Sequence, residues 1–225
     1  MYQQKKILAV IPARGGSKRV VKKNIYPING KPLIWYSIKT ALRAPYIDKL
    51  IVSTDDKEIA DVAKSFGVEV PFMRPSELAE DHTPDGPVFR HALDFFEERG
   101  EAYDYVLNLR PTTPLRSVED ISRTIETAVG NGYDVVRSVT RAEGDQHPFW
   151  MYQAREGILN PLFPDKGIDV YYQRQMLPDN FFMLNAVIDC VSRRQLKEAK
   201  SMYLAHPTGY VEIPKERSLD INDQH

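Results

Sequence analysis

Residues 7–24, which read ILAVIPARGGSKRVVKKN, constrain the fold of this chain more than any other stretch. Five consecutive apolar residues, Ile7 to Ile11, are typical of a strand buried on both faces of a parallel sheet. Pro12 ends this strand, and a basic loop follows in which Gly15 and Gly16 let backbone amides approach an anion closely. The loop carries these cationic side chains: Arg14, Lys18, Arg19, Lys22 and Lys23. The sequence therefore predicts a phosphate site after the first strand, and the anion expected there is a nucleoside triphosphate.

Strand and helix patterns alternate along the first 140 residues. Further short strands are predicted at 50–53, 105–109 and 135–139. Apolar residues with helical spacing lie between them, at 34–42, 59–66, 89–96 and 118–128. This order predicts a doubly wound, mostly parallel α/β sheet. Polar loops at 54–56 and 110–116 follow two of the strands, at the end where open α/β sheets bind their ligands.

The alternation breaks at residues 141–182. This stretch is rich in proline and aromatic residues without a clear periodicity, and it is too apolar to remain disordered. We expect it to form a small inserted arm that covers the site or pairs with a second subunit. The sheet pattern returns at 186–191, so residues 1–140 and 183–225 are expected to form one α/β domain.

The overall composition excludes several classes of partner. With 30 basic and 31 acidic residues among 225, the chain has no global positive field for nucleic acid or an anionic membrane. No apolar stretch approaches the length of a membrane span, and no signal peptide is indicated. The single cysteine, Cys190, lies in an apolar run and indicates a core residue in a reducing compartment. The histidines show no metal-ligand spacing. We expect a cytoplasmic protein that binds neither nucleic acid nor membrane.

Five segments resemble the acylneuraminate cytidylyltransferases, the enzymes that activate sialic acids. These segments are IPARGGSKRVVKKNIYPINGKPLI at 11–34, STDD at 53–56, MRPSELAED at 73–81, LRPTTPLR at 109–116 and ERSLDIN at 216–222. The resemblance implies a Rossmann-like nucleotidyltransferase fold and a homodimer. It also implies transfer of a cytidylyl group from CTP to the anomeric hydroxyl of a nonulosonic acid, which is a 2-keto sugar acid, with release of pyrophosphate.

The basic loop suits the phosphate chemistry of this reaction. In-line attack at the α-phosphorus requires neutralised phosphate oxygens and a firmly held leaving group. Arg14 and Lys18 suit the leaving phosphates, and Lys23 suits the α-phosphate. The resemblance also assigns these residues to CTP: Gly15, Gly16, Ser17, Asn24 and Arg74. Asn24 has both a donor and an acceptor, which suits the edge of a cytosine, and Arg74 is implied to lie at the base.

The resemblance assigns Arg110, Arg174, Gln175 and Asn185 to the sugar. Arg110 stands where the family commonly has glutamine, and a guanidinium suits a carboxylate or a differently substituted sugar. This difference favours a bacterial relative of N-acetylneuraminate, such as legionaminic or pseudaminic acid.

The implied cofactor is Mg²⁺, which commonly takes one or two protein carboxylates together with waters and phosphate oxygens. Asp220 matches the first metal-binding aspartate of the family. Asn222 stands where the second is often aspartate, and Asp223 follows it.

Two alternatives stay open from the sequence. One is an enzyme that activates Kdo, the eight-carbon 3-deoxy sugar acid of lipopolysaccharide. The other is a non-catalytic protein that binds a nucleotide or nucleotide sugar, in which Arg110 and Asn222 mark the loss of the sugar and metal sites.

Overall fold

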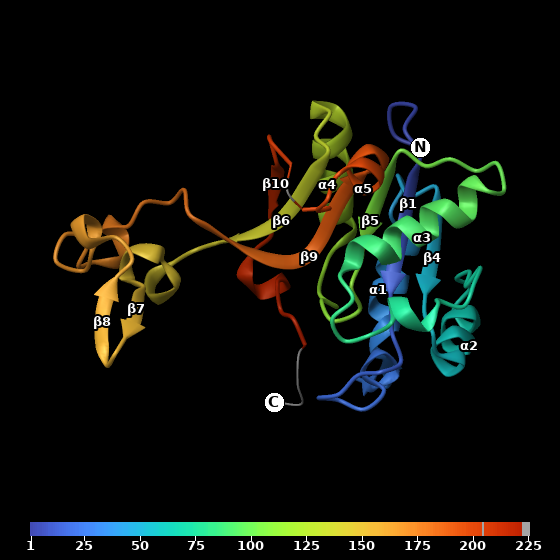
Figure 1. The fold of residues 1–225 in the computed structure, drawn as a ribbon, viewed down its shortest axis with the longest axis horizontal. Helices are drawn as coiled ribbons and strands as arrows, with labels where there is room; N and C mark the ends of the chain where they lie inside the picture. Colours follow the sequence, from blue (N-terminus) through green and yellow to red (C-terminus); the bar gives the residue numbers. More distant parts are fainter. Residues whose placement is uncertain (204, 222–225) are drawn as a thin grey trace.

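The first strand, β1 (Ile7–Pro12), lies inside a six-stranded sheet of order β10-β6-β9-β5-β1-β4 (Figure 1). The computed structural model describes residues 1–203 and 205–221. The other strands of this sheet are β4 (Lys49–Ser53), β5 (Tyr105–Asn108), β6 (Val135–Arg141), β9 (Phe182–Ser192) and β10 (Gly209–Glu212). Strand β1 pairs in parallel with β4 and β5, and β10 pairs in parallel with β6. Strand β9 runs antiparallel to both of its neighbours. The predicted doubly wound, mostly parallel sheet is confirmed.

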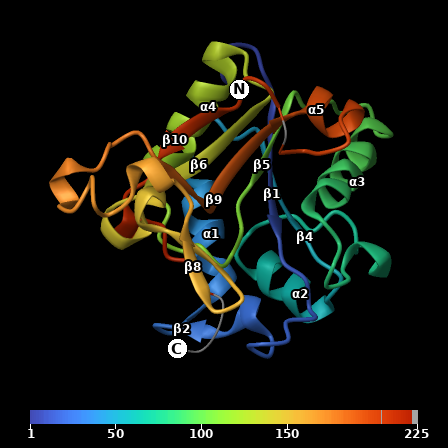
Figure 2. The same cartoon turned by 60° about the vertical axis from the view of Figure 1, so that its left-hand side comes forward.

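Helices cover both faces of the sheet (Figures 1 and 2). They are α1 (Leu33–Leu42), α2 (Lys57–Ser65), α3 (Asp85–Glu97), α4 (Val118–Asn131) and α5 (Arg193–Glu198). Alternate residues of β1 face opposite ways: Ile7 and Ile11 pack in one cluster with α1, α2 and α4, whereas Leu8 and Val10 pack in another with α3 and α5. Strand β1 is therefore apolar throughout because both of its faces are buried.

Local signals set the starts of two helices. Asp56 caps α2, because its carboxylate accepts hydrogen bonds from the amides of Glu58 and Ile59. Ser117 and Asp120 form a reciprocal capping box at the start of α4.

No helix in the described part of the chain combines the length and hydropathy needed to cross a membrane. Cys190 is a free, buried thiol, as predicted, and burial raises its pKa.

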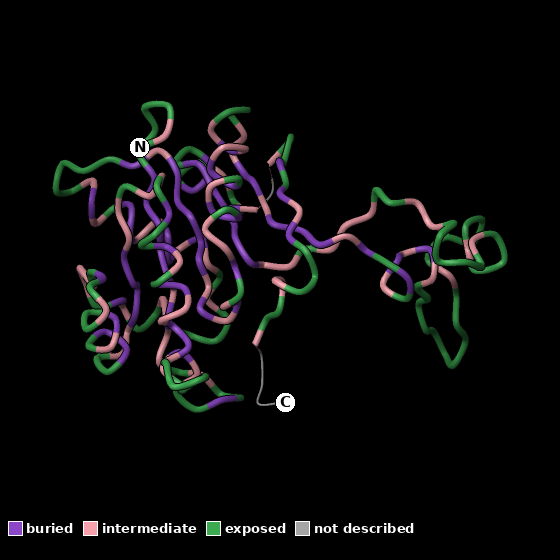
Figure 3. Tube along the Cα trace, turned by 180° about the vertical axis from the view of Figure 1, so that it is seen from behind, coloured by how far each residue is buried: buried purple, intermediate pink, exposed green. Residues whose placement is uncertain are grey.

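After β6 the chain leaves the sheet, and it returns at the start of β9 (Figure 1). The segment between them carries a two-stranded antiparallel hairpin, β7 (Tyr152–Arg155) and β8 (Ile158–Pro161). Its small core centres on Phe149, which is 3% exposed and packs against the rings of His147 and Phe181. Most of the rest of this segment is exposed (Figure 3). We call residues 142–181 the arm.

Two short strands form a separate antiparallel sheet after the basic loop. Strands β2 (Pro27–Ile28) and β3 (Lys31–Pro32) form a hairpin that leads directly into α1. Its turn contains Asn29 and Gly30, both with positive φ, which these residue types adopt at low cost. The hairpin therefore connects the basic loop to α1.

Candidate active site

A cavity of about 550 Å³ opens beyond the carboxyl ends of β1, β4 and β5. Open α/β sheets bind their ligands at this edge. The sequence-predicted residues that line it are Arg14, Ser17, Lys18, Lys23, Asn24, Arg74 and Arg110. The acidic residues that line it are Glu80, Asp81 and Asp85. The structure thus brings the basic loop, the MRPSELAED segment and the LRPTTPLR segment around one cavity.

Gly15 anchors the basic loop to the end of β4. Its amide donates to Oδ1 of Asp55 over 2.9 Å, and a Cβ at this position would lie 2.7 Å from Oδ2 of Asp56. The amide of Gly15 is therefore already hydrogen-bonded within the protein. Glycine is required here because Asp56, at the start of α2, leaves no room for a Cβ. A Cβ on Gly16 would meet no atom within 4 Å.

Replacing Gly15 with alanine is expected to lower the free energy of unfolding by about 1 kcal/mol, because Asp56 must move and its helix cap is weakened. The same change displaces the loop and should weaken CTP binding. Gly167→Ala is the control and should change neither property, because a Cβ on Gly167 would meet no atom within 4 Å and this residue lies in the arm, outside the cavity. Urea denaturation and calorimetric titration with CTP measure both effects, and equal behaviour of the two variants would contradict this role of Gly15.

The carboxylate of Asp81 bridges two of the predicted phosphate ligands. Its Oδ1 lies 2.8 Å from Nη1 of Arg14, and its Oδ2 pairs with the ammonium of Lys18. Hydrogen bonds from Lys18 and then Arg14 lower the pKa of Asp81. A triphosphate that binds these two cations must therefore exchange with this carboxylate.

Asn24 and Arg74 line the cavity while supporting its wall. The Nδ2 of Asn24 donates to the backbone oxygen of Arg14 over 2.9 Å, and Asn24 is 6% exposed. Arg74 is equally buried, and its guanidinium donates to the hydroxyl and the backbone oxygen of Ser53. Burial lowers the pKa of Arg74 to about 10. Contact of either side chain with the base stays a prediction.

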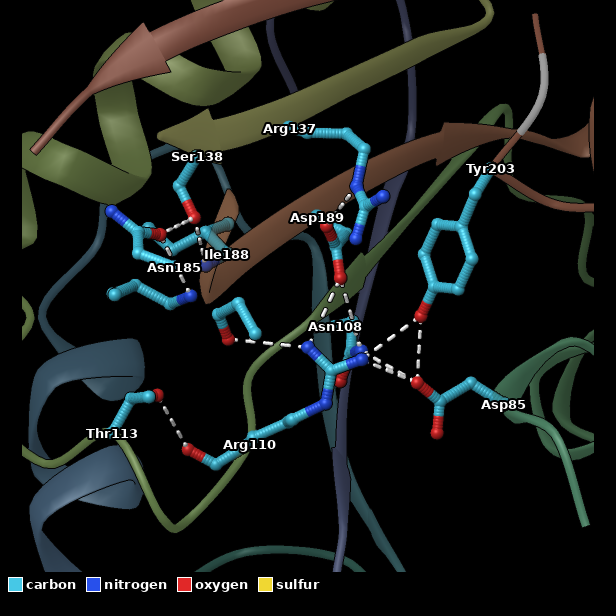
Figure 4. Close-up of polar contacts among 12 residues, drawn as sticks. Asp85, Asn108, Arg110, Thr113, Arg137, Ser138, Asn185, Ile188, Asp189 and Tyr203 are labelled. Carbon is cyan, nitrogen blue, oxygen red and sulfur yellow. Dashed lines mark hydrogen bonds and ion pairs between the residues drawn. The ribbon is translucent and has the colours of Figure 1, made fainter. Parts of the chain in front are cut away.

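Arg110 lies in a polar cluster at the end of β5 (Figure 4). Its Nη1 donates to Oδ2 of Asp189 and to the backbone oxygen of Ala186, each over 3.1 Å. Its Nη2 lies 2.5 Å from Oδ2 of Asp85 and 2.9 Å from the hydroxyl of Tyr203. Burial disfavours its charge, but Asp85 and Asp189 outweigh burial and raise the pKa of its guanidinium. The two carboxylates already balance the charge that was expected to meet a substrate carboxylate.

Arg116 holds the LRPTTPLR loop from inside. It is 3% exposed and donates to the backbone oxygens of Arg110 and Val187 and to the hydroxyl of Ser37. Sequence reasoning gave this residue no role. The sequence did contain a signal for this role. The short loop carries two arginines, Arg110 and Arg116, and when one of them faces the cavity the other is free to support the turn.

Asn185, which the resemblance assigns to the sugar, lies in a β-bulge of β9, and its contact with the sugar stays a prediction. Its Oδ1 accepts from the hydroxyl of Ser138 over 2.6 Å (Figure 4) and from the amide of Val187 over 3.2 Å. Its Nδ2 donates to the hydroxyl of Thr140 over 2.9 Å. The pairing register of β6 and β9 shifts at this point, and Ala186 has a φ of 55°. Asn185 therefore satisfies the polar groups that the bulge leaves unpaired, and it does not line the cavity.

Arg174 and Gln175 also lie away from the cavity within one chain. Both line a separate hollow in the arm with Gly144 and Pro178. A Cβ on Gly144 would lie 2.5 Å from Nη2 of Arg174, so the guanidinium packs directly on this glycine. The expected grouping of these residues with Arg110 around one sugar is not present in the single chain.

The segment with the predicted metal ligand runs beside the cavity. The backbone oxygen of Ile221 accepts from Nζ of Lys23 over 3.2 Å, and its amide donates to the backbone oxygen of Thr112 over 2.8 Å. Asp220 directly precedes this residue. Asn222 and Asp223 lie outside the described residues. Among residues 1–203 and 205–221, no three His, Cys, Asp or Glu side chains form a group that could hold a metal alone.

Besides Arg116, sequence reasoning missed four residues of this site: Asp81, Asp85, Asp189 and Tyr203. Asp189 had a usable signal, because a lone carboxylate inside the apolar run AVIDCV requires a partner when it is buried. Asp81 was part of a recognised segment without an assigned role. Asp85 and Tyr203 carried no local signal.

Comparison with known proteins identifies similar sequences over most of the chain. The family model described as cytidylyltransferase matches residues 8–202. The chain is 37% identical over 223 residues to a pseudaminic acid cytidylyltransferase of Campylobacter jejuni, covering 88% of this chain and 96% of that protein. It is also 37% identical over 209 residues to a CMP-N,N'-diacetyllegionaminic acid synthase of Legionella pneumophila, covering 90% and 84%.

A solved CMP:2-keto-3-deoxy-manno-octonic acid synthetase complexed with CTP has the same fold. It superposes with a TM-score of 0.69 at 17% identity and covers 97% of this chain and 93% of that structure. At this identity the likeness concerns the fold alone.

Proposed function

Because the chain belongs to the cytidylyltransferase family, we propose that it transfers the cytidylyl group of CTP to the anomeric hydroxyl of a nonulosonic acid and releases pyrophosphate. The observation that carries this proposal is the placement of Arg14, Lys18 and Lys23 around one cavity at the carboxyl edge of the sheet. Similarity over most of the chain to enzymes named for pseudaminic and legionaminic acids supports a nonulosonic acid as the acceptor.

Different residues of the cavity bind different phosphates of CTP. Arg14 and Lys18 leave Asp81 and bind the β- and γ-phosphates, where negative charge grows as pyrophosphate departs. Lys23 binds the α-phosphate while the sugar hydroxyl attacks in line with the leaving group. Holding both substrates in one cavity makes the attack effectively intramolecular.

The donor set beside the cavity fits magnesium. Asp220 supplies one carboxylate next to a backbone segment held by Lys23 and Thr112. Mg²⁺ usually takes only one or two protein carboxylates and completes its shell with waters and phosphate oxygens, so a larger protein cluster is not required. When bound there, the ion would neutralise phosphate charge. Asp220 would hold it, and Asn222 or Asp223 would supply a further oxygen.

The proposal is tested by pyrophosphate release from CTP in the presence of Mg²⁺ and single sugar acids. We expect turnover with pseudaminic or legionaminic acid, and a lower kcat/KM with N-acetylneuraminate. Preference for Kdo over every nine-carbon acid would contradict the assigned acceptor. Binding of CTP without turnover on the whole panel would favour the non-catalytic alternative.

The arm is proposed to pair two chains. The hairpin presents Ile158 and Leu159, which are 63% and 66% exposed, and Tyr172 elsewhere in the arm is 63% exposed. Isolated apolar surface of this kind is stabilised when a second copy covers it. In such a dimer Arg174 and Gln175 would approach the cavity of the other chain, which would reconcile their predicted sugar contact with their place in the arm.

Replacing Ile158 and Leu159 together with glutamate is expected to convert a dimer into a monomer and to lower kcat/KM for the sugar, because the arms no longer pair. Leu42→Glu is the control, since Leu42 is 54% exposed on α1, outside the arm. Sedimentation velocity measures the mass. A monomeric wild-type chain with full activity would contradict the pairing.

A further inference from the structure

Asp85 differs from the other acidic residues of the cavity because the protein fixes one of its carboxylate oxygens. Oδ2 accepts hydrogen bonds from the hydroxyl of Tyr203 over 2.7 Å and from Nη2 of Arg110 over 2.5 Å. The Nδ2 of Asn108 lies 3.4 Å from the same atom. In Figure 4 these groups converge on this oxygen, and the other carboxylate oxygen points away from them. Asp81, in contrast, pairs through both carboxylate oxygens with Arg14 and Lys18 of the basic loop.

Counted together with Asp85, the charged cluster that holds this carboxylate has no net charge. Asp189 is 1% exposed and lies 3.1 Å from both Arg110 and Arg137, and the guanidinium of Arg137 stacks over the ring of Tyr203 at 4.2 Å. Two arginines therefore face two aspartates. Burial raises the pKa of Tyr203, so its hydroxyl keeps the proton that it donates to Asp85. The cluster orients a carboxylate and leaves little positive charge for binding a substrate anion.

Asp85 lines the cavity, and its contacts with Arg110, Asn108 and Tyr203 all use Oδ2, which leaves Oδ1 as the oxygen that can meet a bound substrate. An ionised carboxylate only accepts hydrogen bonds. Both proposed substrates are anions, so a fixed carboxylate that holds no metal ion is favourable only where it meets an N–H or O–H group of the substrate. CTP offers its cytosine amino group and ribose hydroxyls, and the sugar acid offers hydroxyls and N–H groups of its acylamino substituents.

We propose that Asp85 determines substrate specificity by accepting a hydrogen bond at Oδ1 from an N–H or O–H donor of the bound substrates, and that Tyr203 is a positioning residue for this carboxylate. The inference rests on the proposed function. It also gives Arg110 a different use from the one predicted: the guanidinium orients Asp85, and the specificity attributed to Arg110 is exerted through that carboxylate.

The test compares Asp85→Asn and Tyr203→Phe in the full-length protein. Two series of substrates distinguish the source of the donor. The nucleotide series is CTP, UTP and 2′-deoxy-CTP with the preferred sugar, and the sugar series is the preferred acid and its deaminated counterpart with CTP. The control is Tyr103→Phe, because the hydroxyl of Tyr103 donates to Glu101 before the start of β5, at the opposite edge of the sheet.

We expect Asp85→Asn to reduce the ratio of kcat/KM between the preferred substrate and the analogue lacking the donor by about 10- to 100-fold, the usual value of a hydrogen bond to a charged group. Tyr203→Phe should change the same ratio in the same direction by a smaller factor, and Tyr103→Phe should not change it. A change in the nucleotide series assigns the donor to CTP, and a change in the sugar series assigns it to the acid.

Unchanged ratios in both series for Asp85→Asn and Tyr203→Phe would overturn the proposal, as would an equal loss on all substrates. If Asp85→Asn does not fold, the ratios of Tyr203→Phe decide alone. Wild-type turnover separates the two hypotheses: no turnover on any sugar contradicts the proposed function, whereas turnover with unchanged ratios in the variants contradicts only the role of Asp85.

Discussion

Replacing Lys23 with methionine is expected to lower kcat/KM for CTP by about 10²- to 10³-fold, the usual loss when one preorganised contact to developing charge is removed. Lys23 lines the cavity and lies beside the segment that carries Asp220. Methionine keeps most of the length of the side chain and removes the ammonium group, together with its hydrogen bond to the backbone oxygen of Ile221. Steady-state kinetics with saturating sugar and Mg²⁺ measures the effect.

The neighbouring residue supplies the control. Lys22 pairs with Glu58 on the surface and does not line the cavity. Lys22→Met should therefore stay within about twofold of wild type, because exposed ion pairs contribute little. Equal losses for the two variants would mean that the general charge of the loop matters and that Lys23 has no specific position at the α-phosphate.

The second large effect is expected from Asp189→Asn, which should lower the free energy of unfolding by about 3 kcal/mol. Removing one partner of a buried ion pair leaves the remaining charge without compensation. Asp189 is 1% exposed and serves both Arg110 and Arg137, whose side chains are 23% and 17% exposed. Their partial contact with solvent places the expected loss at the lower end of the usual range for buried pairs.

Urea denaturation measures this loss, with Asp94→Asn as the control. Asp94 is 53% exposed and pairs with Lys197 on the surface, so its replacement should cost less than about 1 kcal/mol. Similar urea midpoints for Asp189→Asn and wild type would contradict the expected contribution of this ion-pair cluster to the free energy of unfolding.

The parts of the molecule that the sequence predicts well depend on local signals. The run Ile7 to Ile11 is apolar because both faces of β1 are covered, and the following loop is recognisable from its glycines and cations. Ser117 indicates the start of α4, because its capping box with Asp120 lies within four residues. Each of these features needs no information from distant parts of the chain.

The interior of the site depends on contacts between distant residues. Arg110 is bonded to Asp85, 25 residues earlier, and to Asp189, 79 residues later. Nothing near Arg110 in the sequence indicates that two carboxylates neutralise it. The place of Asn185 in the fold could not be predicted from the sequence for the same reason, because its partners lie on β6 and the bulge that requires them exists only once β6 and β9 pair.

The central claim is tested most directly by identifying the product formed from CTP, Mg²⁺ and pseudaminic or legionaminic acid. Mass spectrometry and ³¹P NMR should show a CMP-sugar with one phosphodiester to the anomeric carbon, formed in equal amount to pyrophosphate, and the product should be strongly reduced with Lys23→Met. Absence of a CMP-sugar with every nonulosonic acid and with Kdo, despite CTP binding, would contradict the account.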